Sequence, residues 1–94
     1  MADLIVYIST VAGNLEMKKH QQRIEMILTS KKIPVEYVDV AASEEDRKKM
    51  RDAVGDPKAL PPQFVSKQHG YLGNFEAFDN AVEMDELNVF LKSE

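Results

Sequence analysis

The chain has 94 residues, of which 44% are hydrophobic, and its formal net charge is −4. It contains no cysteine, which excludes disulfide bonds, cysteine-bound metals and thiol chemistry. We expect one domain over residues 1–94, in the cytoplasm and also in the nucleus, because no apolar run approaches the ~18 residues of a membrane span and no secretory signal precedes the first strand.

The first part of the chain alternates between strand and helix patterns. Residues 4–8 (LIVYI) form a short apolar run rich in β-branched side chains, which is typical of a buried strand. Asn14 can cap a helix that ends near Ser30. Its apolar positions recur at helical spacing, at Met17, Ile24, Ile27 and Leu28. Residues 35–40 (VEYVDV) predict a second strand.

A second helix is predicted between Ser43 and Gly55. Ser43 with Asp46 three residues later matches a helix-capping pattern, and Gly55 suits a left-handed C-cap. This helix carries a basic cluster made of Arg47, Lys48, Lys49 and Arg51. A solvated helix face is the favoured interpretation of the cluster, with a phosphate-binding or localisation patch as the alternative.

A proline-rich irregular segment leads into a predicted hairpin. Residues 64–66 and 71–72 have strand character, with Gly70 at the turn. Asn74 can cap a third helix, and a short fourth helix follows. Residues 67–94 hold two lysines and six acidic residues, so we expect no nucleic-acid partner. Most acidic runs of this kind are solvated helix faces, and a minority attract a basic partner.

The predicted order, β-α-β-α-β-β-α-α, resembles the thioredoxin fold in its glutaredoxin form. Residues 60–65 (LPPQFV) resemble the Thr-Val-Pro of glutaredoxins and the strand that follows it, with Pro62 at the cis-proline position. The match runs without a gap to residues 72–74 (LGN), and the Cys-x-x-Cys motif of the family falls on residues 13–16 (GNLE). The resemblance implies an α/β domain with a four-stranded mixed sheet and helices on both faces.

Several uncommon segments narrow this resemblance to the SH3-binding glutamic-acid-rich-like proteins. They are residues 9–13 (STVAG), residues 20–22 (HQQ), residues 56–63 (DPKALPPQ) and residues 71–78 (YLGNFEAF). The chain resembles the short members, which lack the glutamate-rich tail. Because a glutaredoxin acts through a thiolate and this chain has none, we expect no enzymatic activity and no cofactor. His20 and His69 are expected in solvent, and no metal site is expected.

The resemblance also implies a candidate binding groove. In the parent fold, backbone groups beside the cis-proline and at the start of the third helix bind glutathione or an extended peptide. The corresponding residues here are Pro61, Pro62, Gly73, Asn74 and Phe75. The loop at the lost redox motif completes the candidate surface with Thr10, Val11, Ala12, Gly13, Asn14 and Leu15. Phe75 is interpreted either as a rim residue of the groove or as a core residue of the third helix.

Two functions remain open at this point. The favoured hypothesis is a monomeric, non-catalytic adaptor that binds other proteins through the vestigial groove. The alternative is a module that binds glutathione weakly and modulates redox pathways. Thr10 stands where a lysine usually holds a glutathione carboxylate, which favours the adaptor. Direct SH3 binding is disfavoured, because Ala59 replaces the first proline that a PxxP ligand would need.

Overall fold

The computed structural model describes residues 2–11 and 13–92. Ala12, which belongs to the predicted loop, lies outside the described residues. The elements follow the predicted order: β1 (Leu4–Ile8), α1 (Leu15–Ser30), β2 (Val35–Asp39), α2 (Glu44–Val54), β3 (Gln63–Ser66), β4 (Gly70–Asn74), α3 (Phe75–Glu83) and α4 (Leu87–Leu91). Among the described residues, no helix is both long and apolar enough to cross a bilayer.

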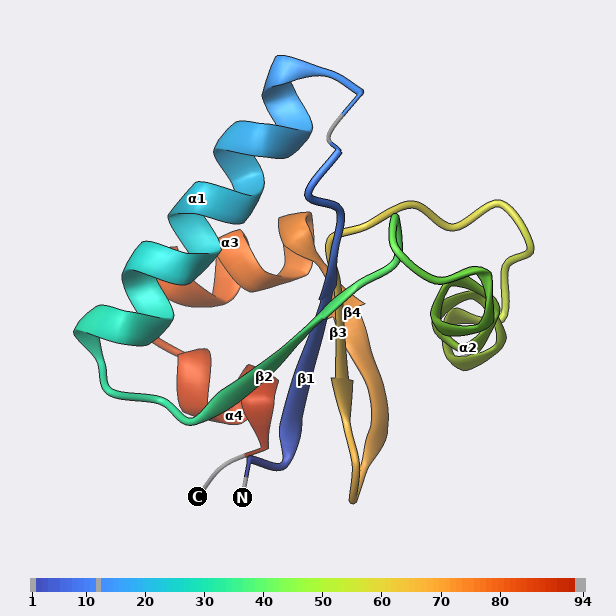
Figure 1. The fold of residues 1–94 in the computed structure, drawn as a ribbon. Coiled ribbons are helices and arrows are strands. Elements are labelled where there is room, and N and C mark those ends of the chain that lie inside the picture. The colour runs from blue at the N-terminus through green and yellow to red at the C-terminus, as the bar shows by residue number, and fades with distance from the viewer. Residues whose placement is uncertain (1, 12, 93–94) are drawn as a thin grey trace.

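The four strands form one mixed sheet in the order β2-β1-β3-β4. β1 pairs with β2 in parallel, whereas β3 pairs antiparallel with both β1 and β4. Figure 1 shows α1 and α3 on one side of the sheet and α2 on the other. The predicted mixed sheet with helices on both faces is therefore confirmed.

Each face of the sheet has its own hydrophobic cluster, because successive side chains of a strand point to opposite faces. The first cluster joins β1 and β3 to α1, α3 and α4 through Leu4, Val6, Ile24, Leu28, Phe64, Phe78, Leu87 and Leu91. The second cluster lies under α2 and consists of Tyr7, Val40, Met50 and Ala59. The two clusters support different parts of the candidate surface.

The helix starts follow the capping pattern expected from the sequence. The side-chain oxygens of Asn14, Ser43 and Asn74 accept hydrogen bonds from the backbone N–H groups three residues later, at 2.7, 3.2 and 3.0 Å. Such caps satisfy amides that have no partner within the helix. Gly55 ends α2 in the left-handed conformation, with φ of 82°.

Gly73 lies where β4 turns into α3, and the turn requires a glycine. Its φ is +154°, and a Cβ atom there would come within 2.9 Å of both the Ala77 Cβ and the Phe90 ring. The missing side chain lets the strand approach α3 and α4 closely. The start of α3, which carries several predicted site residues, is positioned by this contact.

Candidate functional site

The segment before β3 forms the centre of the candidate site. The Pro61–Pro62 peptide bond is cis, as predicted. Pro62 is buried, whereas the side chain of Leu60 is 61% exposed. Leu60 and Pro61 line two separate pockets, one on each side. We call this pair of residues the Leu60–Pro61 ridge.

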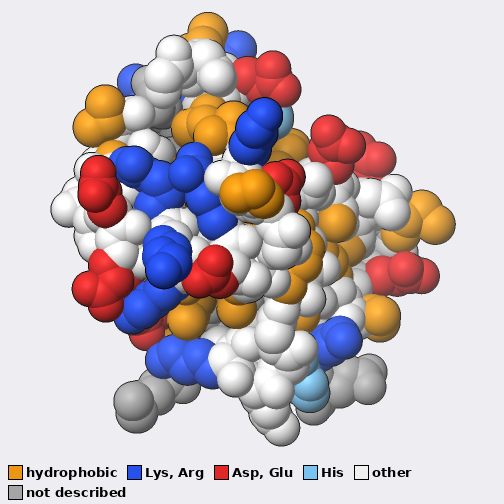
Figure 2. Space-filling view, turned by 90° about the vertical axis from the view of Figure 1, so that its right-hand side faces the viewer, with side chains coloured by type: hydrophobic (Ala, Val, Ile, Leu, Met, Phe, Trp, Pro, Cys, Tyr) orange, Lys and Arg blue, Asp and Glu red, His pale blue; other side chains and the backbone are white. Residues whose placement is uncertain are grey.

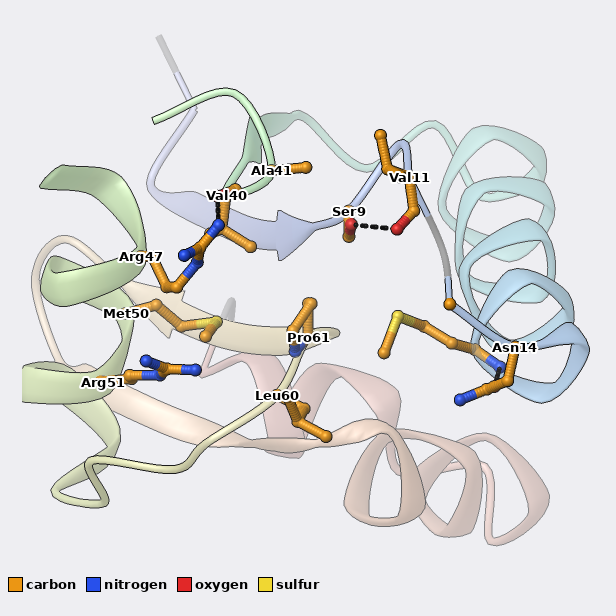
Figure 3. A pocket seen from close by; sticks show the side chains of 12 residues that line it. Ser9, Val11, Asn14, Val40, Ala41, Arg47, Met50, Arg51, Leu60 and Pro61 are labelled. Atoms are coloured by element: carbon orange, nitrogen blue, oxygen red, sulfur yellow. Dashed lines mark hydrogen bonds between the residues drawn. The ribbon is translucent and has the colours of Figure 1, made fainter. Parts of the chain in front are cut away.

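The first of these pockets, the basic pocket, lies between the loop after β1 and α2 (Figure 3). Its volume is about 610 Å³. It is lined by Ser9, Val11, Gly13, Asn14, Met17, Val40, Ala41, Arg47, Met50, Arg51, Leu60 and Pro61. Two arginines and no acidic residue are present in this lining. Three residues of the predicted loop, Val11, Gly13 and Asn14, therefore lie together with Pro61.

Arg47 and Arg51 are held in place by backbone carbonyl groups. Arg47 Nη2 donates a hydrogen bond to the carbonyl oxygen of Val40 (3.1 Å), and Arg51 Nε donates to that of Ala59 (3.2 Å). Both arginines are half-buried, whereas Lys48 and Lys49 are exposed. The expected solvated helix face therefore describes Lys48 and Lys49, whereas the two arginines are only partly exposed because α2 turns this side towards the pocket.

The second pocket, the acidic pocket, lies on the other side of the ridge and has a volume of about 500 Å³. It is lined by Glu16, His20, Val54, Asp56, Lys58, Ala59, Leu60, Pro61, Pro62, Gln63, Tyr71, Asn74, Phe75 and Glu76. Three acidic residues thus face one lysine. The phenol of Tyr71 donates a hydrogen bond to Gln63 Oε1 (2.9 Å), and burial raises the pKa of Tyr71 above its usual value. Tyr71 therefore stays neutral at physiological pH.

Phe75 is both a wall of the acidic pocket and a neighbour of the core. Its ring stacks on the imidazole of His20, with centroids 3.8 Å apart and an angle of 5° between the planes. It is half-buried and packs against the first hydrophobic cluster. Phe75 is therefore both a rim residue of the pocket and a neighbour of the core, so each of the two sequence interpretations is correct in part. His20 stacks on this ring and keeps 29% of its side-chain surface exposed, so it is less solvated than expected.

The other predicted residues lie apart from the two pockets or contribute to the fold. Thr10 points to the end of β2, where its N–H and hydroxyl donate to the Asp39 carboxylate at 3.2 and 2.6 Å. The hydroxyl bond is the largest cause of the lowered pKa of Asp39. Leu15 is exposed and lines neither pocket, and Gly73 is buried. Asn74 lines the acidic pocket, but its side-chain oxygen caps α3.

A comparison with models of known protein families shows which family the chain belongs to. The model of the family described as "SH3-binding, glutamic acid-rich protein" matches residues 2–94. The chain belongs to this family. It is 42% identical over 101 residues to a relative from Drosophila melanogaster named "SH3 domain-binding glutamic acid-rich protein homolog". The match covers 95% of this chain and 63% of that relative, so the chain spans less than two thirds of the length of the relative.

Solved structures confirm the glutaredoxin-like form of the thioredoxin fold for this family member. A wheat glutaredoxin matches with a TM-score of 0.70 over 97% of this chain and 80% of its own, at 10% identity. The actin interacting protein Aip5 from C. albicans matches with a TM-score of 0.73 over 97% of this chain and 89% of its own, at 26% identity. The names of the family and of the second structure refer to binding proteins and not to enzymes.

The sequence interpretation named Arg47 and Arg51 as part of a basic cluster but did not place them beside the predicted loop. One signal was available, because Arg47 and Arg51 are four residues apart and so share one face of a helix. The sequence does not show which face α2 turns towards the loop after β1. In the described part of the chain, no group of three or more His, Asp or Glu residues has the arrangement of a metal site.

Proposed function

We propose that this chain is a non-catalytic adaptor that binds another protein across the Leu60–Pro61 ridge, with the basic and acidic pockets on either side. The absence of cysteine excludes the thiolate on which glutaredoxin chemistry depends. What remains of that site is a surface with two pockets and an exposed leucine shared by both. Contiguous exposed apolar groups with a polar rim mark protein-binding sites, and Val11 and Leu60 line the same pocket.

One observation carries this proposal: the ridge and the adjacent loop expose large aliphatic side chains at the mouths of the pockets. Leu60 is 61% exposed and Val11 is 77% exposed. Neither side chain is needed to fill a hydrophobic cluster. Burying such groups against a partner contributes about 25 cal/mol per Å² of apolar surface.

The charges around the ridge favour a protein over glutathione. Glutathione carries two carboxylates and one ammonium group, while the acidic pocket presents Glu16, Asp56 and Glu76 against Lys58 alone. The first amides of α3 also face a competing acceptor, because the Asn74 side chain already caps the helix. A helix N-terminus binds a carboxylate best when its amides are free.

The kind of partner is indicated by the relatives. An SH3 domain reads an extended polyproline helix, but here Ala59 replaces a proline and both Ala59 and Pro62 are buried. The segment is therefore poorly presented to an SH3 domain. The actin-interacting protein shares the fold over 97% of this chain, so actin is the first partner to test.

The test compares two substitutions at equally exposed apolar positions. Leu60 and Met84 are both 61% exposed, and Met84 lies at the end of α3 outside both pockets. Binding to filamentous actin is measured by co-sedimentation, and photo-crosslinking from position 60 or 84 identifies other partners in cells. We expect Leu60→Asp to weaken binding about tenfold or more, as loss of an interface anchor does, and Met84→Asp to leave it unchanged. Equal binding by the two variants, for every crosslinked protein, would refute the adaptor proposal at this site.

A further inference from the structure

We propose that the basic pocket receives an acidic side chain of the bound protein, held as a carboxylate between Arg47 and Arg51, with a neighbouring aliphatic side chain over Leu60 and Val11. This inference rests on the proposed adaptor function and adds the chemistry of the segment that is bound. The ligand is an internal acidic and apolar stretch of the partner protein.

The two guanidinium groups are pre-organised for an anion. Each uses one N–H in a bond to a backbone carbonyl, at Val40 and at Ala59. The remaining N–H groups of a guanidinium form a planar fork that matches a carboxylate. Because these bonds already restrain the side chains, less conformational entropy is lost when an acid binds. Figure 3 shows both arginines extending from α2 towards the interior of the pocket.

Arg47 and Arg51 have acidic neighbours on α2, because both also line a separate pocket with Glu44 and Asp52, but neither carboxylate forms an ion pair with them. Arg23, Lys49 and Lys67 form ion pairs with Asp79, Glu45 and Glu36. Arg47 and Arg51 form no such pair in residues 2–11 and 13–92, and no acidic residue lines the pocket. In a chain with a net charge of −4, two half-buried arginines that form no ion pair with their acidic neighbours favour an acid from another molecule.

The apolar residues of the basic pocket favour an aliphatic side chain next to the acidic side chain of the bound segment. Met50 is fully buried and Val40 is nearly so, and both line the pocket beside the arginines. Val11 and Leu60 are exposed at its edge. Figure 2 shows basic and hydrophobic side chains next to one another on the face that includes α2. An acidic side chain next to a leucine-like side chain fits this combination, whereas an inorganic anion would leave the apolar edge in water.

The volume agrees with a short peptide segment. Small-ligand pockets in proteins span roughly 300–1,000 Å³, and the basic pocket measures about 610 Å³. This is room for a few side chains and too little for a folded element. The opposite charge of the acidic pocket would repel the same segment, so the partner would be oriented across the ridge.

The test uses two blocked tripeptides, N-acetyl-Leu-Glu-Leu-amide and N-acetyl-Leu-Gln-Leu-amide, which differ only in the central charge. Binding to the intact chain is followed by NMR, including the side-chain Nε–H signals of Arg47 and Arg51. We expect the glutamate peptide to shift both signals and to bind roughly tenfold tighter than the glutamine peptide, as a charge-assisted hydrogen bond implies.

A matched pair of variants separates the pocket from general charge. Arg47→Gln/Arg51→Gln removes two positive charges from the pocket side of α2, and Lys48→Gln/Lys49→Gln removes two from its exposed side. The first is expected to weaken the glutamate peptide about tenfold, and the second less than twofold. Thermal melting checks that both variants are folded. A third variant, Arg47→Lys/Arg51→Lys, keeps the charge but not the planar guanidinium fork, and its affinity for the glutamate peptide should lie between those of the two glutamine variants.

Three results would overturn the inference: equal binding of the two peptides, equal weakening by the two glutamine variants, or shifts centred on the acidic pocket. Tighter binding of reduced glutathione than of the glutamate peptide at Arg47 and Arg51 would also overturn it. These failures leave the adaptor proposal standing if Leu60→Asp still weakens partner binding and Met84→Asp does not. Conversely, peptide binding without any effect of Leu60→Asp would refute the adaptor at this site.

Discussion

The two pockets share the Leu60–Pro61 ridge, but they differ in charge and in what supports them. The basic pocket has two arginines, an exposed loop residue at its edge and a floor made by the second hydrophobic cluster. The acidic pocket has a wall, Phe75, that also packs against the first cluster. The basic pocket thus lies over the smaller cluster, with exposed groups at its edge, whereas the acidic pocket is continuous with the larger cluster.

Because of this difference, we expect substitutions on the two sides of the ridge to affect stability and binding differently. On the basic side, the exposed side chains of Val11 and Leu60 can change with little effect on stability, because neither belongs to a hydrophobic cluster. On the acidic side, function and folding share the same residues, so a loss of binding can be a loss of fold. Paired substitutions, one on each side, separate the two effects.

The largest expected effect is at Gly73, with Gly13 as its matched control. Gly73→Ala should lower the free energy of unfolding by about 3 kcal/mol, because the new Cβ would lie 2.9 Å from Ala77 and Phe90. Gly13→Ala should change it by less than about 0.5 kcal/mol, since no atom lies within 4 Å of the new Cβ. Urea denaturation measures both. Similar stability of the two variants would show that the close approach at Gly73 is not a constraint.

The next effect concerns the aromatic wall. Phe75→Ala should lower the free energy of unfolding by about 2 kcal/mol, because the contacts of the ring with the core and its stack on His20 are lost. The loss is smaller than for a fully buried phenylalanine, since the ring is only partly buried. Leu60→Ala should cost less than about 0.5 kcal/mol, because its side chain is exposed. Chemical denaturation checks the pair. A negligible effect of Phe75→Ala would identify Phe75 as a rim residue alone.

The fold was predictable because its local signals agree with one another. The apolar run of β1, the caps at Asn14, Ser43 and Asn74, and the glycine that ends α2 each mark a boundary through short-range chemistry. The resemblance supplied the topology and the cis peptide bond. Strand ends were less accurate: β3 begins at Gln63, one residue before the prediction, because ladder pairing with β1 and β4 extends the strand.

The site was predictable only in part, because its shape depends on tertiary contacts. The sequence indicated one groove, whereas the structure divides most of its described residues between two pockets and leaves Thr10, Leu15 and Gly73 outside both. Thr10 belongs to neither pocket because its hydroxyl is bonded to Asp39, 29 residues away. The roles of Arg47 and Arg51 depend on carbonyl groups of distant segments. No local pattern encodes such contacts.

A smaller effect is expected from the two asparagine caps, one beside each pocket. Asn14→Ala and Asn74→Ala should each lower the free energy of unfolding by about 1 kcal/mol, because each removes the acceptor of a helix N–H. Asn14→Asp and Asn74→Asp keep that acceptor and should retain most of the stability. Denaturation of the four variants measures the effect. A loss in the aspartate variants as large as in the alanine variants would contradict a capping role.

The smallest expected effect is a pH dependence at the loop of the basic pocket. The Thr10 hydroxyl donates to Asp39 and is the first cause of the lowered pKa of this carboxyl group. A carboxyl group with a lowered pKa stabilises the folded state fully above its unfolded pKa of about 3.9, and this contribution is lost as the pH falls through the folded pKa. Thr10→Val removes the hydroxyl bond and leaves the weaker bond from the Thr10 N–H.

The Tm of Thr10→Val should therefore lie below that of the wild type at pH 6, and the difference should narrow as the pH falls below about 4. Other carboxyl groups, such as Asp3 with its bond to Ser66, titrate in both proteins and cancel in the comparison. Thr29→Val, at an exposed position of α1, controls for the loss of a threonine hydroxyl and should show no such trend. A Tm difference that stays constant with pH would mean that Thr10 orders the loop through packing and not through the Asp39 carboxylate. In that case the edge of the basic pocket would keep its shape in acid, and the binding of an acidic segment would decline there only through protonation of the ligand itself.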